Sequence, residues 1–356
     1  MKLYQKKYFS RHRGRGARFC TFAYARTKSA HIPVLLNEVI EILDPQPGEF
    51  FIDGTIGSGG HSSEILKKIG PTGKLLGIDW DKDAIENFEL NLKPKTYKLK
   101  AIKMVHGNYA DLPEILSAQG GSASGGKKQN LPKANGLILD LGFSSEQLES
   151  GKPAYANLRF ANGFGKARAS AGKGFSFQKD EILDMRYNSE SGNLTAAEVL
   201  NQFSEKELAD IFYKYGEERL SRRIAKKIIE ERKKERILTT FDLVGIIKKA
   251  VPRSYERGRL HPATRVFQAL RIYVNRELEN LEAVLKNLEK IVKNRGRVAI
   301  ISFHSLEDRM VKNYFRQMEK EGRGKILTKK PIRPTNSEVI NNHRSRSAKL
   351  RAIILN

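Results

Sequence analysis

The chain contains very little cysteine. Cys20 is the only one among 356 residues, which excludes an internal disulfide and a cluster of thiolate metal ligands. Long apolar runs are missing too: no segment approaches the roughly 20 residues needed to cross a bilayer. Residues 298–301 have only the length of a buried strand. We therefore expect a soluble protein without a membrane partner, from a reducing compartment. Its length allows two domains, or one domain with a large insertion.

Acidic residues are few relative to basic ones. The 65 Lys and Arg against 40 Asp and Glu give a formal net charge of +25, which indicates an acidic polymer such as nucleic acid as partner. Residues 1–30 hold nine basic residues and no acid, and residues 322–351 hold nine against one acid, Glu338. Both ends are expected to be arms that grip a polyanion, with solvated tails as the alternative. The expected location is the cytoplasm, or a mitochondrion or plastid if residues 1–30 are a transit peptide.

A glycine-rich turn is the most informative feature that is present. The apolar run 50–53 ends at Asp53, and Gly57, Gly59 and Gly60 follow before a helical pattern begins. Open α/β sheets bind nucleoside cofactors at such turns, where glycine lets backbone N–H groups approach a ligand. The third glycine of the dinucleotide fingerprint is absent, which weakens a nicotinamide cofactor as the interpretation.

Two acids at strand ends favour another nucleoside. Asp53 would stand beside the phosphates of a dinucleotide, whereas S-adenosylmethionine has no phosphate and carries two cationic groups. The apolar run 74–79 ends in Asp79, 26 residues later, where a carboxylate accepts hydrogen bonds from a ribose diol. Together these acids predict an S-adenosylmethionine site.

Strand and helix patterns alternate along most of the chain. Such alternation predicts a parallel, doubly wound α/β sheet that binds ligands beyond the carboxyl ends of its strands. The final two strands are expected to form an antiparallel hairpin, and residues 119–128 a flexible loop. We expect helices at 34–43, 62–69 and 84–92 and strands at 50–53, 74–79, 101–105, 136–141, 296–303, 325–327 and 348–355.

Residues 151–260 interrupt this alternation. A glycine-rich, basic stretch at 163–174 precedes a helical pattern at 195–250 without a convincing strand, and one long helix is expected at 262–292. Within the insert, Leu220, Ile224 and Ile228 recur every four residues, while nearby basic side chains form a solvated face or an RNA contact. The expected domains are a basic extension at 1–30, a sheet domain at 31–150 and 261–356, and an inserted all-helical domain at 151–260.

Seven ordered blocks resemble the RsmH (MraW) family of 16S rRNA cytosine-N4 methyltransferases. The blocks are HIPVL (31–35), DGTIGSGGH (53–61), GFSF (174–177), LDMR (183–186), YGEER (215–219), HPATR (261–265) and SFHSLEDR (302–309). The resemblance implies a class I (Rossmann-like) methyltransferase fold with a helical substrate-recognition insert, and S-adenosylmethionine as donor. It implies a cytidine in the peptidyl-site (decoding) region of small-subunit rRNA as target, in free RNA or in the assembled small subunit.

The resemblance also implies a set of cofactor contacts. The family usually has a basic residue where Trp80 stands and a proline where Glu146 stands. The resemblance therefore does not predict how side chains pack around the adenine or how the loop after the fourth strand is shaped. The oligomeric state is open as well, with a homodimer as one alternative. The implied contacts are Gly59, Gly60, His61, Asp79, Tyr109, Asp140 and Gln147.

The chemistry requires an acceptor for a proton on cytosine N4, whose lone pair is delocalised into the ring. Asp140 at a strand end is the first candidate, with orientation of the donor as its alternative role. Ser144, Ser145 and His304 are weaker candidates, because a polar residue at a strand end also caps helices. Phe143 either stacks on the target base or is buried. The D/N/S-P-P-Y/F element of DNA amino methyltransferases is absent after residue 140, which makes DNA a less suitable target.

Two other functions are consistent with part of these observations. A non-catalytic RNA-binding or ribosome-assembly factor would need the positive charge but not Asp79 and the glycine turn. A nicotinamide-dependent oxidoreductase would need the turn but has no use for the charge.

Overall fold

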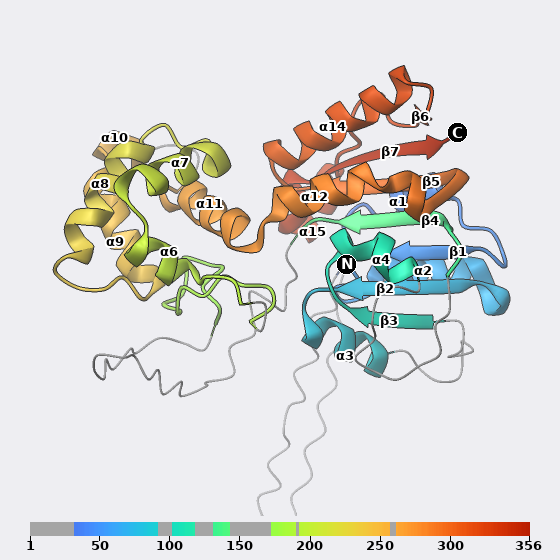
Figure 1. The fold of residues 1–356 in the computed structure, drawn as a ribbon, viewed down its shortest axis with the longest axis horizontal. Coiled ribbons are helices and arrows are strands. Elements are labelled where there is room, and N and C mark those ends of the chain that lie inside the picture. Colours follow the sequence, from blue (N-terminus) through green and yellow to red (C-terminus); the bar gives the residue numbers. More distant parts are fainter. Residues whose placement is uncertain (1–31, 92–101, 118–130, 143–171, 190–191, 257–260) are drawn as a thin grey trace, which may run out of the picture. The chain divides into compact units, whose positions relative to one another are not determined.

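A seven-stranded sheet organises the chain in the computed structural model, which describes residues 32–91, 102–117, 131–142, 172–189, 192–256 and 261–356. The strand order is β3-β2-β1-β4-β5-β7-β6, and β1 to β5 are parallel, while β7 is antiparallel to both of its neighbours (Figure 1). This confirms the parallel sheet and its closing hairpin. The strands are β1 (Phe50–Asp53), β2 (Lys74–Asp79), β3 (Ile102–His106), β4 (Ala134–Asp140), β5 (Val292–Ser302), β6 (Gly324–Ile326) and β7 (Lys349–Leu355).

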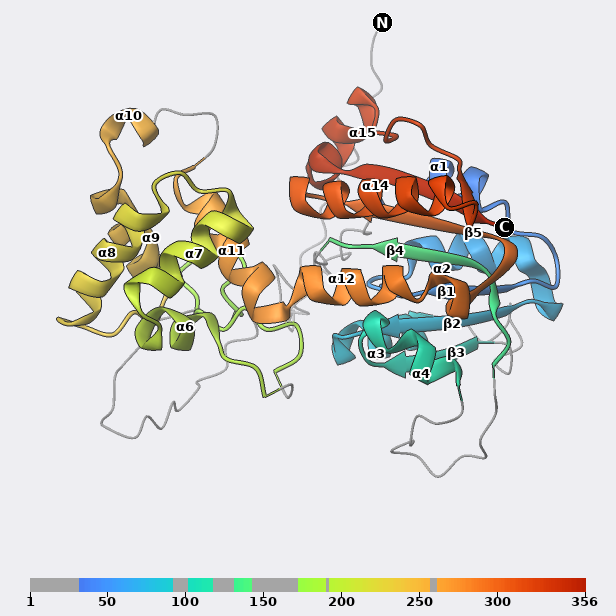
Figure 2. The ribbon, with the colours of Figure 1, turned by 45° about the horizontal axis from the view of Figure 1, so that its top comes forward.

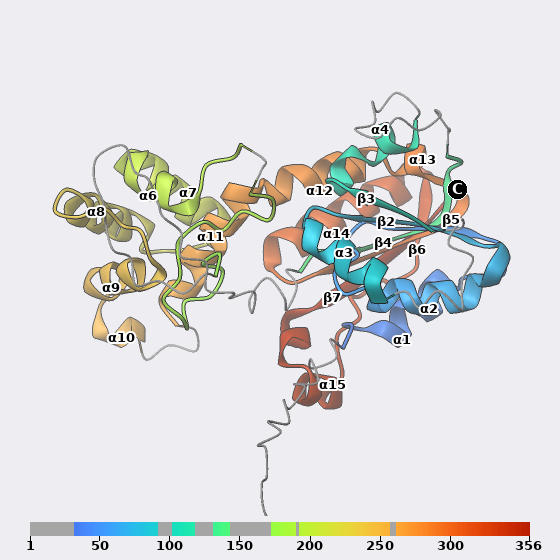
Figure 3. The same cartoon turned by 90° about the horizontal axis from the view of Figure 1, so that it is seen from below.

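Helices cover both faces of the sheet. Alternate side chains of β1 show why: Phe50 and Ile52 join one apolar cluster, and Phe51 joins another. The first cluster packs against α4 (Leu112–Leu116), α12 (Glu277–Lys286), α13 (Leu288–Ile291) and α14 (Ser305–Lys320). The second packs against α1 (Leu36–Leu43), α2 (Gly60–Ile69) and α3 (Lys82–Asn91) (Figure 3).

The segment between β4 and β5 forms a third apolar cluster, built from helices (Figure 2). Three of these helices start with a capping box, at Thr195, Ser204 and Thr239. Ile224 and Ile228 are fully buried in this cluster, as the four-residue spacing predicts. The cluster continues to Val274, beyond the boundary expected at residue 260, which stays a prediction. Its helices are α6 (Ala196–Gln202), α7 (Glu205–Gly216), α8 (Ser221–Arg232), α9 (Thr240–Ala250), α10 (Arg253–Glu256) and α11 (Ala263–Asn275).

The single long helix expected at 262–292 is wrong. Arg276 adopts a left-handed backbone conformation, with φ of 51°, and its N–H closes α11 on the carbonyls of Ile272 and Tyr273. The next residue, Glu277, begins α12. The periodic apolar pattern continues through this break, so the pattern alone did not reveal it. The break matters because it places Glu277 at the functional site.

The expected C-terminal arm is also wrong. Residues 322–351 include β6, α15 (Asn336–Asn341), the 3-10 helix η4 (His343–Ser347) and the start of β7, so this basic segment belongs to the sheet domain. Arg351 is buried, and its Nε donates to the Asp308 carboxylate at 2.6 Å. Part of the basic charge therefore stabilises the fold instead of facing a polyanion.

Several expectations lie outside the described residues: the basic extension at 1–30, the loop at 119–128, most of 163–174, and Phe143, Ser144, Ser145, Glu146 and Gln147. Residues 31–356 form one compact unit. None of the helices in the described ranges is long and apolar enough to cross a membrane.

Candidate active site

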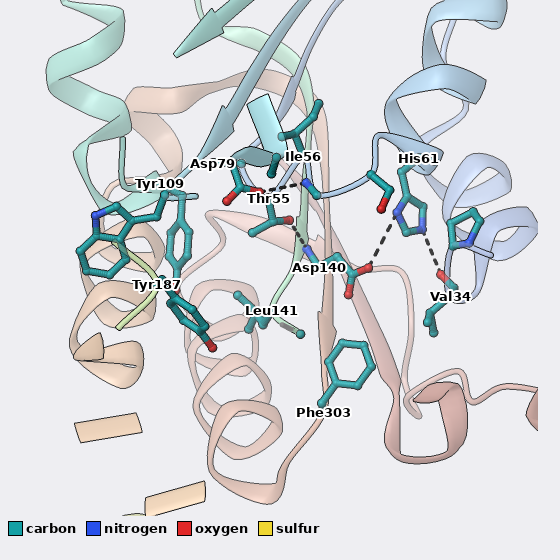
Figure 4. Close-up of a pocket in the computed structure, with 18 of the residues that line it drawn as sticks. Val34, Thr55, Ile56, His61, Asp79, Tyr109, Asp140, Leu141, Tyr187 and Phe303 are labelled. Atoms are coloured by element: carbon teal, nitrogen blue, oxygen red, sulfur yellow. Dashed lines mark hydrogen bonds and ion pairs between the residues drawn. The ribbon is translucent and has the colours of Figure 1, made fainter. Parts of the chain in front are cut away.

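A cavity opens beyond the carboxyl ends of β1, β2 and β4. Its volume is about 140 Å³. Gly60, His61, Asp79, Tyr109 and Asp140, five of the seven predicted cofactor contacts, line it, and the contacts themselves stay a prediction. Figure 4 shows that Asp79 and Tyr109 lie together on one side, Asp140 near the centre and His61 on the other side.

The glycine turn owes its shape to internal contacts. Gly59 has φ of 75°, and a Cβ there would lie 1.9 Å from Cδ2 of Phe88. Its N–H donates to the carbonyl of Ile56 at 2.7 Å, and Gly59 is not part of the cavity lining. Gly60 does line the cavity, and a Cβ there would lie 2.8 Å from the ring of Pro33. Glycine is therefore required at residue 59 mainly by the turn and its packing, and a cofactor contact there stays a prediction.

Asp79 ends β2 with both carboxylate oxygens held by the main chain. Oδ2 accepts from the N–H of Gly57 at 2.9 Å and Oδ1 from the N–H of Asp81 at 2.8 Å. Burial, reinforced by the Asp81 and Asp53 carboxylates, raises the pKa of Asp79 to about 7. Each carboxylate oxygen has a second lone pair, so Asp79 can still accept hydrogen bonds from a sugar diol in the cavity.

Asp53 is not part of the cavity lining, so it makes no direct contact there, and the favourable effect of its charge on a cationic cofactor stays a prediction. Its side chain is buried beneath the turn. There Oδ2 accepts from the hydroxyl of Ser62 at 2.6 Å, and Oδ1 from the N–H of Thr55 at 3.1 Å. Burial raises the pKa of Asp53 to about 6. Its visible role is to fix the end of β1 to the start of α2.

Asp140 ends β4 in the middle of the cavity. Its N–H donates to Oγ1 of Thr55 at 2.6 Å, and its Oδ2 lies 3.9 Å from Nδ1 of His61 (Figure 4). Oδ1 is buried and makes no hydrogen bond of standard geometry in the part of the chain that the structure describes. Burial, with the Asp53 and Glu307 carboxylates adding to it, raises the pKa of Asp140 to about 7, although the N–H of Gly142 lowers it. A buried acceptor without such a bond calls for a functional explanation.

Two acidic residues of the cavity lining, Glu277 and Glu307, were not predicted from the sequence. Both residues line the cavity and both are buried. Arg271 holds the Glu277 carboxylate with Nε at 2.8 Å and Nη2 at 3.0 Å, and Tyr187 donates its hydroxyl to the same group at 3.0 Å. Burial opposes ionisation, but Arg271 is the largest of the groups that lower the pKa of Glu277, which falls to about 2. Glu277 is therefore a fixed negative charge.

His304 is placed as a helix cap and is not part of the cavity lining. Its Nδ1 accepts from the N–H of Glu307 at 3.4 Å, and the Glu307 carboxylate accepts from the N–H of His304 at 3.3 Å, which completes a capping box. Nε2 points between the Glu307 carboxylate at 3.2 Å and that of Glu277 at 3.9 Å. Burial lowers the pKa of His304, but these two carboxylates outweigh it and raise the pKa to about 9. This confirms the capping role, and it removes the ring as an acceptor for a substrate proton.

The same arrangement argues against a metal ion between Glu277, His304 and Glu307, although one ligand atom from each lies within 4.8 Å of the others. A histidine that binds a metal normally donates the hydrogen of its second nitrogen to an acceptor. Here the second nitrogen of His304 faces a backbone N–H, which is a donor. The capping box between His304 and Glu307, with the Glu277 carboxylate 3.9 Å from Nε2, explains the grouping without a metal.

The strand order, the closing antiparallel hairpin and the cavity at the glycine turn are those of a class I methyltransferase. The chain belongs to the MraW methylase family, whose model matches residues 28–157 and 167–355. It is 40% identical over 338 residues to the ribosomal RNA small subunit methyltransferase H of Syntrophotalea carbinolica, covering 91% of this chain and 97% of the relative. The protein of the same name from Syntrophus aciditrophicus is 41% identical over 338 residues, with 91% and 96% covered. The one from Clostridium botulinum Loch Maree is 41% identical over 336 residues, with 90% and 97% covered.

S-adenosylmethionine is the cofactor of this methylase, and the residues present fit it. Asp79 offers acceptors for the ribose diol, and the acid-lined cavity suits a ligand with cationic groups. Trp80 also lines the cavity, where the family usually has a basic residue, and its ring packs against that of Tyr187 at 6.5 Å between centroids. When bound, the cofactor supplies a methyl group on a positively charged sulfur.

Proposed function

We propose that this protein methylates the exocyclic N4 of a cytidine in the peptidyl-site region of small-subunit rRNA, with S-adenosylmethionine as donor. The observation that carries the proposal is Oδ1 of Asp140, a buried acceptor that makes no hydrogen bond of standard geometry in the described residues. It lies in the cavity that also holds Asp79. An amino group that becomes a nucleophile needs such an acceptor beside the donor methyl group.

The part of the cavity next to Asp140 suits a base that presents an amino group. Leu141 and Phe303 give it apolar surface, and Glu277 and Glu307 add acceptors. The amino group of cytosine donates hydrogen bonds, whereas the O4 carbonyl of uracil would face carboxylate oxygens. Carboxylate acceptors therefore favour cytosine over uracil.

The overall charge and the names of the relatives support rRNA as the substrate. The relatives are small-subunit rRNA methyltransferases, and a net charge of +25 suits an RNA partner. On α8, Arg222, Arg223 and Lys226 are exposed on the face opposite the buried Ile224 and Ile228. We propose this face as an RNA contact, and its contribution to affinity should fall steeply as salt concentration rises.

The test supplies labelled S-adenosylmethionine together with either naked small-subunit rRNA or assembled small subunits that lack the modification. Digestion to nucleosides and mass spectrometry should show N4-methylcytidine with one of the two substrates. Asp140→Asn should bind the cofactor but form little product. Absence of label in both substrates would favour an assembly factor without catalysis, and binding of a nicotinamide dinucleotide in place of S-adenosylmethionine would favour an oxidoreductase.

The cellular location and the oligomeric state stay predictions. A cytoplasmic protein is expected, and the alternatives of an organelle location and a homodimer are tested by fractionation, by the mass of the mature chain and by sedimentation.

A further inference from the structure

A small pocket lies on the sheet domain between α14 and the segment from β6 to β7, which packs against this helix (Figure 1). Its volume is about 20 Å³, little more than the roughly 10–15 Å³ that one water molecule needs. It shares no lining residue with the cavity at the glycine turn. The pocket therefore suits one small group, and a base or a sugar does not fit in it. None of its lining residues is acidic, and four are basic: Lys312, Arg316, Lys329 and Arg351.

Two of these basic residues share one face of α14. Lys312 and Arg316 are one helical turn apart, and Asp308 precedes them by one more turn on the same face. This face is turned toward β7, because the Asp308 carboxylate accepts from Nζ of Lys349 at 3.1 Å and from Nε of Arg351 at 2.6 Å. Asp308 is thus paired with two bases already. Lys312 and Arg316 have no ion pair in the part of the chain that the structure describes, so their charges stay uncompensated at the pocket.

The guanidinium of Arg351 is buried but only partly bonded. Its side chain is 9% exposed, and its Nε donates to Asp308. Nη1 and Nη2 make no hydrogen bond to the described residues, yet neither is among the fully buried atoms that lack a partner. Both nitrogens are therefore accessible, and the open space that Arg351 lines is this pocket. Such N–H groups match the oxygens of a phosphate in geometry. Arg351 thus supports the fold through Nε and faces the pocket with its other two nitrogens.

The remaining polar groups around the pocket also fit an anion. Thr328 is buried, and its Oγ1 accepts from the N–H of Ala352 at 2.9 Å, which leaves the hydroxyl hydrogen to donate. Lys329 is exposed and has no ion pair among the described residues. The acid Glu319 on α14 is outside the lining, and its Oε1 accepts from the N–H of Ile326 at 2.8 Å. Every polar side chain of the lining can therefore donate a hydrogen bond, and none carries a negative charge.

We propose that this pocket binds one backbone phosphate of the RNA substrate. The inference rests on the proposed function, from which it takes RNA as the substrate, and it adds a contact outside the methyl-transfer cavity.

The position of the pocket supports this assignment. Glu307, in the first turn of α14, lines the methyl-transfer cavity, and Lys312 lies about 7 Å further along the same helix. An RNA strand that places one base in the cavity therefore brings its backbone within reach of the pocket. Contacts with phosphates fix the position of a strand, whereas contacts with base edges select the sequence. The pocket would thus hold the strand next to its target nucleotide without choosing the base.

The experiment measures the Kd of the full-length protein by fluorescence anisotropy at salt concentrations from about 50 to 200 mM. The probes are a naked rRNA fragment with the peptidyl-site region and assembled small subunits that lack the modification. The test variant combines Lys312→Gln with Lys329→Gln, which removes one charge from each side of the pocket and keeps the bond between Arg351 and Asp308. Loss of one phosphate contact should make the slope of log K against log salt shallower by about 0.7, and should raise the Kd about fivefold near 0.1 M salt.

A matched double variant, Lys68→Gln with Lys74→Gln, removes the same charge elsewhere. Both lysines are exposed and have no ion pair among the described residues. Lys68 lies on α2, which covers the other face of the sheet, and Lys74 begins β2, at the end of the strand away from the cavity. Its Kd for RNA should stay within about twofold of the wild type, because charges further than a Debye length from the strand are screened. Thermal unfolding and the affinity for S-adenosylmethionine should equal the wild-type values in both double variants, since none of the four lysines lines the cofactor cavity.

Several outcomes overturn the inference. An equal loss of RNA affinity in the two double variants would show a general effect of charge, with no specific pocket. An unchanged Kd and slope in the pocket variant, or a wild type that binds neither probe, contradicts the phosphate contact directly. Inorganic phosphate tests the other source of the same group. If it binds the wild type but not the pocket variant, while both bind RNA equally, the pocket serves a free phosphate compound instead of RNA.

The proposed function fails in a different way. A wild type that loses RNA affinity through the pocket variant as expected, but forms no N4-methylcytidine, contradicts the proposed catalysis and still supports the phosphate contact.

Discussion

The carboxylate of Asp79 and the main-chain N–H of Gly57 are joined by a hydrogen bond of 2.9 Å. This bond connects the end of β2 to the glycine turn after β1, across 22 positions in the sequence. Asp79, which we propose as the acceptor for the ribose of the cofactor, therefore also holds the glycine turn. Under this proposal, cofactor binding and the shape of the turn depend on the same side chain.

Replacing Asp79 by Asn should weaken cofactor binding strongly. The amide has one oxygen and one NH₂ group where the carboxylate has two accepting oxygens, and it carries no charge. Since hydrogen bonds to charged groups contribute about 1.5–3 kcal/mol each, we expect the Kd for S-adenosylmethionine to rise about 10- to 100-fold. Calorimetry measures this. Asp81→Asn is the matched control, because Asp81 is a neighbouring acid outside the cavity lining, and an equal loss in both variants would contradict a specific role for Asp79.

Cofactor binding should also depend on pH through Asp79. Its pKa is raised to about 7, mainly by burial, so the carboxylate is ionised at pH 8 and protonated at pH 6. Only the ionised form accepts freely from the diol and attracts a cationic ligand. The affinity for S-adenosylmethionine should therefore fall by about tenfold from pH 8 to pH 6, the limit for one group with this pKa. Titrations across this range test it, and the slope should disappear in Asp79→Asn.

The ends of the strands could be predicted from the sequence because local patterns determine them. The run 50–53 and the run 74–79 match β1 and β2, and the acids at residues 79 and 140 lie at the expected edge of the sheet. Parallel strands align their carboxyl ends, so any acid that follows such a run reaches this edge.

The direction of each side chain could not be predicted in this way. Asp53 turns beneath the glycine loop because Ser62 and the Thr55 amide bind it, a contact that strand periodicity does not encode. Glu277 reaches the cavity only because Arg276 breaks the helix there. One signal in the sequence pointed to this region: the LDMR block ends one residue before Tyr187, whose hydroxyl donates to Glu277. These contacts are tertiary, so they depend on the packing of distant segments.

The buried pair of Arg271 and Glu277 gives a prediction about stability. Arg271 has two hydrogen bonds to the Glu277 carboxylate, and both side chains are largely buried, at 12% and 8% exposure. Glu277→Ala would leave the guanidinium buried without this partner and should reduce the free energy of unfolding by about 3–5 kcal/mol. The double variant Arg271→Met with Glu277→Leu should lose less than that single variant. Urea unfolding of the double variant and of both single variants checks this. If the loss in the double variant equals the sum of the two single losses, the two charges are not coupled.

Ser62 and Asp53 give the last prediction, which concerns the turn itself. The Ser62 hydroxyl donates to Asp53 at 2.6 Å, and burial raises the pKa of Asp53 to about 6 in the folded protein. In the unfolded chain this pKa is near 4, so folding holds Asp53 protonated between about pH 4 and 6. The stabilisation from that raised pKa is complete below pH 4 and is lost as the pH rises through 6.

Ser62→Ala removes a donor that favours the ionised carboxylate, so the folded pKa of Asp53 rises further and stability falls more steeply toward alkaline pH. We expect a loss of about 1.5–3 kcal/mol in the free energy of unfolding at pH 8, where the lost bond is to a charge, and about 0.5–1.5 kcal/mol at pH 5. Urea unfolding at both pH values measures the difference. Ser63→Ala is the control, because the Ser63 hydroxyl donates to the carbonyl of Gly59 at 2.7 Å, which does not titrate. Equal losses at pH 5 and pH 8 in Ser62→Ala would show that Asp53 is not the group that this serine supports.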